Sequence, residues 1–321
     1  MIELILLILG LVGLFIGSGI IVDSSKRIAH KLKISQTLIG LTIVSIGTSI
    51  PEIMTNLFSG YKVSQGIQAS GIAIGTNLGS DITQITLVLG LTALLGTMYA
   101  TKDTLKRDGK MILFSIIAVF IVGYTDNKIT IIEAIGLLIL YILYLYRVAK
   151  NEKFLKAAAN HKKHSPIGKE SLKFIGGLAV LLIASKYVVE SALSLSTQWG
   201  VAQSFIGIMI VGVGTALPEL STAIRAITKK AGDLSIGTLL GSNITDPMLS
   251  LPLGAIAAGT VGLTFDRNLL FFDIPFWFIA SIIALYLLKR NMKIGVDDKK
   301  EGFILVGLYL IFITVKIVYF R

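Results

Sequence analysis

The chain has 321 residues, of which 54% are hydrophobic and only 15% are charged, and its formal net charge at pH 7 is +11. Its mean hydropathy is +0.80. This composition excludes an ordinary soluble domain and indicates an integral membrane protein. Because cysteine is absent, disulfides and thiolate metal sites are excluded as well.

Ten apolar blocks are predicted to form helices, since each is close to the roughly 20 residues that cross a hydrocarbon core. In chain order they are about 3–22, 36–60, 67–98, 111–125, 129–147, 173–195, 203–228, 234–262, 268–288 and 301–320. The blocks do not alternate with period two, so a β-barrel is not expected. The sequence therefore predicts an all-α integral membrane protein with ten transmembrane helices.

Lysine and arginine are distributed unevenly among the gaps between these blocks. If the gaps are assigned alternately to two sides, 24 of the 30 basic residues fall on one side. By the positive-inside rule, the basic linker at 148–172 is cytoplasmic and both termini are outside the cell. The positive net charge is thus explained by basic loops that orient the protein in a cell membrane. Membrane lipids are the expected partners. Neither nucleic-acid binding nor an obligate protein partner is expected.

Two phrases of the chain occur twice. The phrase at 39–52 returns at 206–219 with 8 of 14 positions identical, and the phrase at 73–84 returns at 235–246 with 8 of 12 identical. Each half contains five predicted helices, an odd number, so the second half enters the membrane in the opposite sense. We therefore expect two inverted five-helix repeats, residues 1–150 and 172–321, joined by a basic linker at 151–171.

The first repeated phrase places carboxylates and hydroxyls beside a predicted helix break. A proline in each copy, Pro51 and Pro218, is expected to interrupt the helix and free backbone carbonyl oxygens. The oxygen-bearing side chains around the two breaks are those of Thr48, Ser49, Glu52, Thr215 and Glu219. A carboxylate inside a membrane is a functional candidate, and Ca²⁺ takes about six to eight oxygen ligands. Two facing copies therefore predict a site where Glu52 and Glu219 neutralise one divalent cation, or where Na⁺ or H⁺ replaces it.

The second phrase adds one oxygen pair in each copy. Ser80 and Gln84, like Ser242 and Asp246, stand four residues apart and share one helix face. Small faces that allow close helix approach are expected from the glycines at 71, 75, 79, 237 and 241. Asp81 has no acidic counterpart, because the second copy has Asn243. It is expected either to bind a cation or proton or to pair with a lysine.

Other polar residues are expected to be structural. Asp273 lies just ahead of Pro275, where a helix N-terminal cap would explain it. Glu190 follows Lys186 by four residues and is expected to pair with it near the outer surface. The histidines of the linker, His161 and His164, are expected to be solvated rather than to bind a metal.

The phrases at 47–52 and 79–84, and again at 214–219 and 241–246, resemble the α-repeats of the cation/Ca²⁺ exchanger superfamily. They are most similar to those of prokaryotic sodium/calcium exchangers. The resemblance spans the whole chain and implies an antiporter that works by alternating access. In that family the first and sixth helices slide as a gate across a fixed core.

The resemblance also implies the role of each candidate residue. Glu52 and Glu219 would be the central Ca²⁺ ligands, helped by the backbone carbonyls of Thr48 and Thr215. The implied ligands of the flanking Na⁺ sites are Ser49, Ser80 and Ser242 with the carbonyls of Ser45 and Gly212, while Gln84 and Asp246 lie in the middle.

Three positions depart from the exchanger pattern. Ala216 lacks the usual hydroxyl, Gln84 replaces the more usual Asn or Asp, and Asp81 adds an acid. These departures leave the coupling ion open. We expect Ca²⁺ to be exchanged for Na⁺, with Ca²⁺/H⁺ or K⁺-coupled exchange as the alternative and a cation channel as a more remote one. An enzyme such as an intramembrane hydrolase is not expected, since all three histidines fall in basic gaps, and no cofactor is expected.

Overall fold

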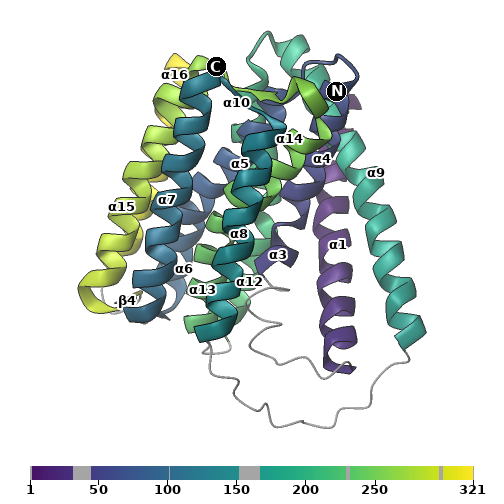
Figure 1. Cartoon of the computed structure of the whole chain (residues 1–321). Coiled ribbons are helices and arrows are strands. Elements are labelled where there is room, and N and C mark those ends of the chain that lie inside the picture. The colour runs from purple at the N-terminus through teal and green to yellow at the C-terminus, as the bar shows by residue number, and fades with distance from the viewer. Residues whose placement is uncertain are drawn as a thin grey trace.

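The structure is a computed structural model that describes residues 2–31, 45–100, 102–151, 167–228, 232–295 and 299–320, and it is built almost entirely of helices (Figure 1). The first half contains α1 (Ile2–Lys31), α3 (Ser45–Thr48), α4 (Ile50–Ser64), α5 (Ser70–Thr83), η2 (Gln84–Val88), α6 (Leu89–Leu95), β1 (Met98–Tyr99), α7 (Lys102–Asp126), β2 (Lys128–Ile129) and α8 (Ile131–Asn151).

The second half contains α9 (Ile167–Trp199), α10 (Gln203–Ile206), η3 (Gly207–Gly212), α11 (Val213–Thr215), α12 (Leu217–Thr228), α13 (Gly232–Thr245), η4 (Asp246–Ser250), α14 (Leu251–Ala257), η5 (Gly259–Val261), β3 (Leu263–Thr264), η6 (Leu269–Asp273), α15 (Ile274–Asn291), β4 (Lys293–Ile294) and α16 (Lys299–Tyr319). The segments η2, η3, η4 and η6 are π-helical turns.

Eight helical segments in the described ranges are long and apolar enough to cross a membrane. They coincide with eight of the predicted spans. The predicted span at 36–60 begins outside the described residues, and its described part is divided between α3 and α4. The predicted span at 234–262 is divided into α13, η4 and α14, and it carries the polar residues Ser242, Asn243 and Asp246 in its middle.

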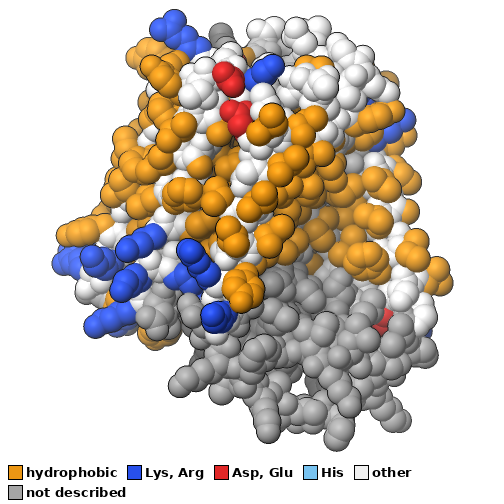
Figure 2. All heavy atoms as spheres, viewed as in Figure 1, with side chains coloured by type: hydrophobic (Ala, Val, Ile, Leu, Met, Phe, Trp, Pro, Cys, Tyr) orange, Lys and Arg blue, Asp and Glu red, His pale blue; other side chains and the backbone are white. Residues whose placement is uncertain are grey.

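The surface is apolar over much of its area, and polar residues are buried inside beside the hydrophobic core. Ile132, Leu172 and Ile2 are 82%, 70% and 71% exposed, whereas Gln84 and Asn243 are fully buried. Hydrophobic side chains cover the middle of the face seen in Figure 2, and Lys and Arg side chains gather at its lower end. An apolar exterior suits lipid, and a polar interior then needs a functional reason. This distribution confirms the predicted membrane class.

The two halves are joined by short strands. β1 pairs with β4, and β2 pairs with β3, both antiparallel. Asn127, between α7 and β2, and Met292, between α15 and β4, both have a φ of 54°. This left-handed conformation is uncommon outside glycine and is typical of the residue that ends a helix. The same helix end therefore recurs in both halves.

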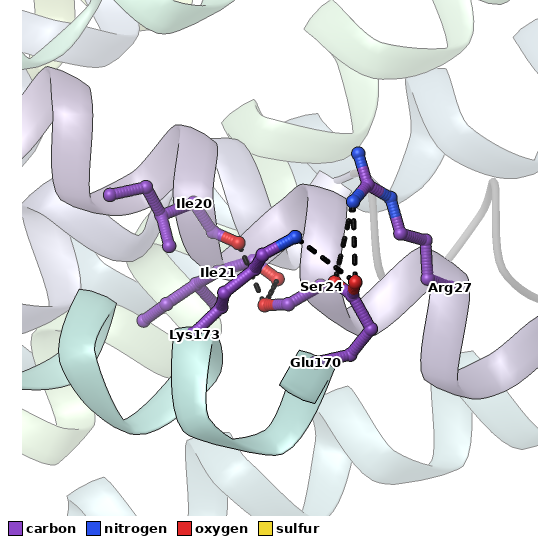
Figure 3. Close-up of polar contacts among 6 residues, drawn as sticks. All are labelled: Ile20, Ile21, Ser24, Arg27, Glu170 and Lys173. Carbon is purple, nitrogen blue, oxygen red and sulfur yellow. Dashed lines mark hydrogen bonds and ion pairs between the residues drawn. The ribbon is translucent and has the colours of Figure 1, made fainter. Parts of the chain in front are cut away.

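α1 and α9 form a pair along one side of the molecule (Figure 1). The helices approach closely because α1 has glycines on the shared face. A Cβ added to Gly13 would lie 2.9 Å from the Cβ of Ala184. At one end of the pair, Glu170 of α9 accepts hydrogen bonds from Arg27 Nη1 of α1 at 3.4 Å and from Lys173 Nζ at 3.0 Å (Figure 3).

Two acids have partners other than those predicted. Asp273 makes no capping hydrogen bond; it is buried and accepts a hydrogen bond from Lys316 Nζ of α16 at 2.6 Å. The prediction of a helix cap was wrong because a lysine distant in sequence supplies the partner. Glu190 accepts a hydrogen bond from Lys62 of α4 at 2.7 Å, which replaces the predicted ion pair with Lys186.

Candidate functional site

Both copies of the first phrase break a helix as predicted. The first copy is interrupted at Ser49, between α3 and α4, and the second at Ala216, between α11 and α12. Pro51 lies at the start of α4, where a missing backbone N–H costs least. Glu52 and Glu219 therefore lie in the first turns of α4 and α12. Unpaired N–H groups at a helix start stabilise nearby negative charge.

Each glutamate accepts a hydrogen bond from the serine of the second phrase in its own half. Ser80 Oγ donates to Glu52 Oε1 at 2.6 Å, and Ser242 Oγ donates to Glu219 Oε1 at 3.4 Å. Thr48 Oγ1 lies 3.3 Å from Ser242 Oγ, so the first break contacts the second half. The repeated phrases thus meet at one place with equivalent contacts.

A chain of hydrogen bonds extends from Ser80 into the second half. Gln84 Nε2 donates to Ser80 Oγ at 2.9 Å, and Gln84 Oε1 accepts from Asn243 Nδ2 at 3.0 Å. Asn243 Oδ1 in turn accepts from Trp277 Nε1 of α15 at 3.3 Å. Both ends of the Gln84 amide are therefore occupied by protein groups.

Four acids are buried together at this place. Glu52, Asp81, Glu219 and Asp246 are all 0% exposed. The charge of Asp81 interacts with those of the other three, and the charges of Glu219 and Asp246 also interact with that of Glu52. No ion pair in the described ranges involves any of these four acids. Buried carboxylates without a basic partner are costly unless they bind a cation or a proton.

Many oxygens of the site make no hydrogen bond. Within the described residues these include Ser49 Oγ, Glu52 Oε2, Glu219 Oε2 and both carboxylate oxygens of Asp81 and of Asp246. Buried polar atoms normally have partners, so their concentration points to a ligand. No three acid or imidazole side chains of the described part converge closely enough to hold a metal by themselves. A cation bound here would also need hydroxyl and carbonyl oxygens.

A family model described as sodium/calcium exchanger protein matches residues 2–150 and 171–318 of this chain. This chain belongs to that family. It is 31% identical to the sodium/calcium exchanger MaX1 of Methanosarcina acetivorans over 98% of each chain. It is also 31% identical to an uncharacterized membrane protein of Methanocaldococcus jannaschii, over 96% of this chain and 95% of the relative.

The fold is similar to solved structures of the sodium-calcium exchanger NCX_Mj. One of these, soaked with Na⁺ and without Ca²⁺, matches with a TM-score of 0.66 at 30% sequence identity over 99% of each chain. The match confirms the resemblance found in the repeated phrases. It also agrees with a multi-pass membrane transporter rather than an enzyme.

Gly212 and Ser45 are the remaining predicted ligands of this exchanger. Gly212 ends η3 beside α5, where an added Cβ would lie 2.7 Å from the backbone nitrogen of Ser80. Its carbonyl oxygen accepts hydrogen bonds from Ala216 N at 3.1 Å and from Thr215 Oγ1 at 3.2 Å, so it has protein partners here. Ser45 begins α3, and its side chain lies outside the described residues.

The predicted glycine faces are confirmed in the first half. Cβ atoms added to Gly75 and Gly79 of α5 would lie 2.8 Å from Ser204 O and 2.5 Å from Ile208 O. The segments α10 and η3 of the second half thus contact the backbone of α5 directly. Among the described residues, nothing lies within 4 Å of a Cβ added to Gly237. The equivalent of η3 in the first half falls at about 40–45, almost wholly outside the described part.

Sequence analysis missed three polar residues of the site. Asn56 Nδ2 donates to the backbone oxygen of Glu52 at 2.8 Å and to Ser250 Oγ of η4 at 3.0 Å. Its position four residues after Glu52, on the same helix face, was the available signal. Asn243 was noted only as the neutral counterpart of Asp81. Trp277 lies outside both phrases and gave no signal.

Proposed function

We propose that this exchanger moves Ca²⁺ across the cell membrane in exchange for Na⁺ by alternating access. One observation carries the proposal. Two glutamates at repeat-equivalent helix breaks are buried, each accepts a hydrogen bond from the equivalent serine, and neither has a basic partner in the described residues. Such a pair neutralises one divalent ion, and Na⁺ ions can replace it at the same oxygens.

We assign the ligands as the family resemblance implies. Glu52 and Glu219 bind Ca²⁺ together with the carbonyl oxygens of Thr48 and Thr215. The proposed Na⁺ ligands are Ser49, Ser80, Ser242 and the carbonyls of Ser45 and Gly212, with Gln84 and Asp246 between them. The carbonyl of Gly212 and the amide of Gln84 already have protein partners, so these two would exchange partners when an ion binds.

The proposed architecture is ten transmembrane helices in two inverted five-helix repeats, residues 1–150 and 172–321, with a linker at 151–171. Three observations support it. Helix breaks recur at Ser49 and Ala216. π-helical turns begin at the equivalent residues Gln84 and Asp246. The family model also matches two separate segments, 2–150 and 171–318.

We propose that the basic loops and the linker at 148–172 face the cytoplasm, with both termini outside. The two ends of the chain lie at the same end of the molecule in Figure 1, and Lys and Arg side chains gather at the opposite end in Figure 2. That arrangement follows the positive-inside rule. Membrane lipids then surround the apolar helices.

An alternative coupling ion is favoured by two residues of the site. Ala216 removes a hydroxyl that a flanking Na⁺ site would use, and Asp81 adds a buried carboxylate. These residues favour Ca²⁺/H⁺ or K⁺-coupled exchange as the second candidate. The two candidates differ in the gradient that drives Ca²⁺ uptake.

Uptake of radioactive Ca²⁺ into proteoliposomes loaded with Na⁺, K⁺ or acid tests both candidates. Wild type is compared with Glu52→Gln, with Glu219→Gln and with a matched control, Asp126→Asn, which neutralises an exposed acid at the end of α7. Uptake that requires internal Na⁺ and is lost in both glutamine variants supports Na⁺/Ca²⁺ exchange. Uptake that follows the pH or K⁺ gradient supports the alternative, and normal uptake by both glutamine variants refutes the proposed site.

A further inference from the structure

Tyr141 of α8 contacts the second phrase of the other half, although it belongs to neither repeated phrase. Its hydroxyl oxygen lies 2.8 Å from Thr245 Oγ1, and both residues are buried. Thr245 Oγ1 itself donates a hydrogen bond to Gly241 O at 2.9 Å. A hydroxyl has a single proton to donate, so the Thr245 hydroxyl accepts from Tyr141. The direction of this contact is therefore fixed, with the Tyr141 hydroxyl as the donor.

Thr245 is the last residue before the helix changes from α to π geometry. α13 ends at Thr245, and η4 begins at Asp246. Turns of this kind are rare, and they occur often at functional sites. Pro247 lies within the turn and has no N–H, so it cannot add a backbone hydrogen bond there. A side-chain hydrogen bond to Thr245 can therefore decide how the chain enters the turn.

The carboxylate of Asp246 depends on this backbone for its direction. Both of its oxygens are buried, and neither makes a hydrogen bond within the described residues. Its direction is therefore set largely by the backbone at the start of η4. Tyr141 acts on that backbone through Thr245, the residue that precedes the acid.

The Tyr141 side chain is itself held by its surroundings. α8 packs against η4 and α14 of the second half. The Tyr141 ring also stacks on the ring of Tyr144, with 6.4 Å between the ring centroids. A tyrosine has few rotatable bonds, so a packed ring places its hydroxyl at low cost in conformational entropy. A rigid group of the first half thus anchors the π-helical turn of the second.

The same construction recurs in the opposite direction. Tyr309 of α16 is buried, and its hydroxyl interacts with Thr83, the repeat-equivalent of Thr245. Thr83 is also the last residue before a π-helical turn, because η2 begins at Gln84. α16 packs against η2, as α8 packs against η4. A tyrosine from the last described helix of each half therefore contacts the other half at the equivalent residue.

We propose that Tyr141 is a positioning residue of the exchanger, which directs the Asp246 carboxylate toward bound Na⁺ by donating a hydrogen bond to Thr245. This inference rests on the proposed function, which assigns Asp246 to the Na⁺ ligands. Tyr141 does not touch the ion, so its hydroxyl governs how tightly Na⁺ is held and leaves the number of ligands unchanged. Loss of the hydroxyl therefore weakens Na⁺ binding without removing transport.

The test measures Ca²⁺ uptake by the full-length protein in proteoliposomes over a range of internal Na⁺ concentrations. Tyr141→Phe keeps the ring and removes the donor. Its half-saturating Na⁺ concentration should rise about 2- to 10-fold, the range that one hydrogen bond supplies, while the maximal rate is retained. The matched control is Tyr144→Phe, which removes a hydroxyl of the same helix that donates to Asp108 Oδ1 at 2.8 Å. This control should keep the half-saturating Na⁺ concentration of wild type.

Variants of the acceptor separate positioning from a purely structural role. Thr245→Val removes the acceptor, whereas Thr245→Ser keeps it, so Thr245→Ser should lie closer to wild type in its Na⁺ dependence. Tyr141→Phe combined with Thr245→Val should shift the half-saturating Na⁺ concentration no further than the larger single effect, because both remove the same hydrogen bond. Size-exclusion chromatography shows which variants are folded, and the two Thr245 variants decide the matter if Tyr141→Phe is not.

The inference is overturned if folded Tyr141→Phe has the Na⁺ dependence of wild type, if only its maximal rate falls, or if the two single effects add. It is also overturned if Thr245→Val and Thr245→Ser behave alike. Failure of the proposed function looks different, because wild type itself would then take up Ca²⁺ without internal Na⁺. In that case the same variants are compared on the ion that does drive uptake.

Discussion

The hydrogen bond from Trp277 to Asn243 connects α15 to the candidate site, although Trp277 belongs to neither repeated phrase. The sequence was sufficient to find Glu52 and Glu219, because the repeats mark equivalent positions and the membrane makes a buried acid costly. It was insufficient for Trp277, whose contact depends on how α15 packs against α13. The interaction of Asp81 with Asp246 also depends on the way the two halves face each other.

Trp277→Phe tests the chain of hydrogen bonds that orients Gln84. The substitution keeps a buried aromatic ring but removes the donor to Asn243. A hydrogen bond contributes about 0.5–1.5 kcal/mol, so the half-saturating Ca²⁺ concentration for uptake should rise about 2- to 10-fold. Trp199→Phe, at the exposed end of α9, is the matched control. An unchanged Ca²⁺ dependence in Trp277→Phe would show that this chain does not position the site.

The ion pair of Asp273 and Lys316 provides a second prediction at this scale. Both side chains are 0% exposed, and their charged atoms lie 2.6 Å apart. Removing one partner of a buried pair costs about 3–5 kcal/mol, whereas replacing both costs much less. Thermal unfolding in detergent should therefore show a larger loss for Asp273→Asn or Lys316→Met than for Asp273→Leu combined with Lys316→Met. Additive losses would mean that the two charges are not coupled.

At the scale of helices, the sequence predicted the positions of the helix breaks better than the residues at which helices begin and end. Pro51 and Pro218 predict the breaks at Ser49 and Ala216, because proline disrupts the helix that precedes it. The π-helical turn that begins at Asp246 contains Pro247, but the equivalent turn at Gln84 contains no proline. The turn at Gln84 therefore could not be predicted from the local sequence. Ends such as Ile167, the start of α9, also differ from the apolar block that begins at 173, since polar residues extend the helix beyond it.

Gly79→Ala tests the contact between α5 and η3. Its Cβ would lie 2.5 Å from Ile208 O and 2.6 Å from Ile208 Cα, so backbone would have to move. Overpacking of this kind costs about 1–3 kcal/mol, and the thermal unfolding temperature should fall. Gly136→Ala in α8, where nothing among the described residues lies within 4 Å, should cause no such loss. Equal behaviour of the two variants would contradict the close contact.

At the scale of the whole molecule, α1 and α9 contact each other along their length, and α5 packs within the core. Family resemblance implied that the first and sixth helices slide as a gate across a fixed core. The ion pair of Glu170 in α9 with Arg27 in α1, and the close contact at Gly13, agree with a pair that stays together (Figure 3). Sequence alone could not predict this contact, because the second half can be placed beside the first in several ways.

Engineered disulfides test whether the pair moves as a unit, and the absence of native cysteine makes them selective. Gly13→Cys with Ala184→Cys joins α1 to α9, and Val22→Cys with Gly47→Cys joins α1 to the segment before Glu52. The Cβ added to Gly47 lies 3.6 Å from Val22 Cβ, within the roughly 3.5–4.5 Å of a disulfide. The Cβ added to Gly13 lies 2.9 Å from Ala184 Cβ, so α1 and α9 must separate slightly to form the first bond. Oxidation should preserve Ca²⁺ uptake in the first variant and stop it reversibly in the second. Inhibition of the first variant would show that α1 and α9 slide past each other.

The pairing of β1 with β4 and of β2 with β3 has a consequence for synthesis. Each strand of the first half has its partner in the second half, so neither pairing can form until residues beyond 263 or 293 have left the ribosome. Thr48 also lacks its contact with Ser242 until the second half has been made. During synthesis the first half must therefore remain in the bilayer with unpaired strand edges and unpartnered polar side chains until most of the second half has been made.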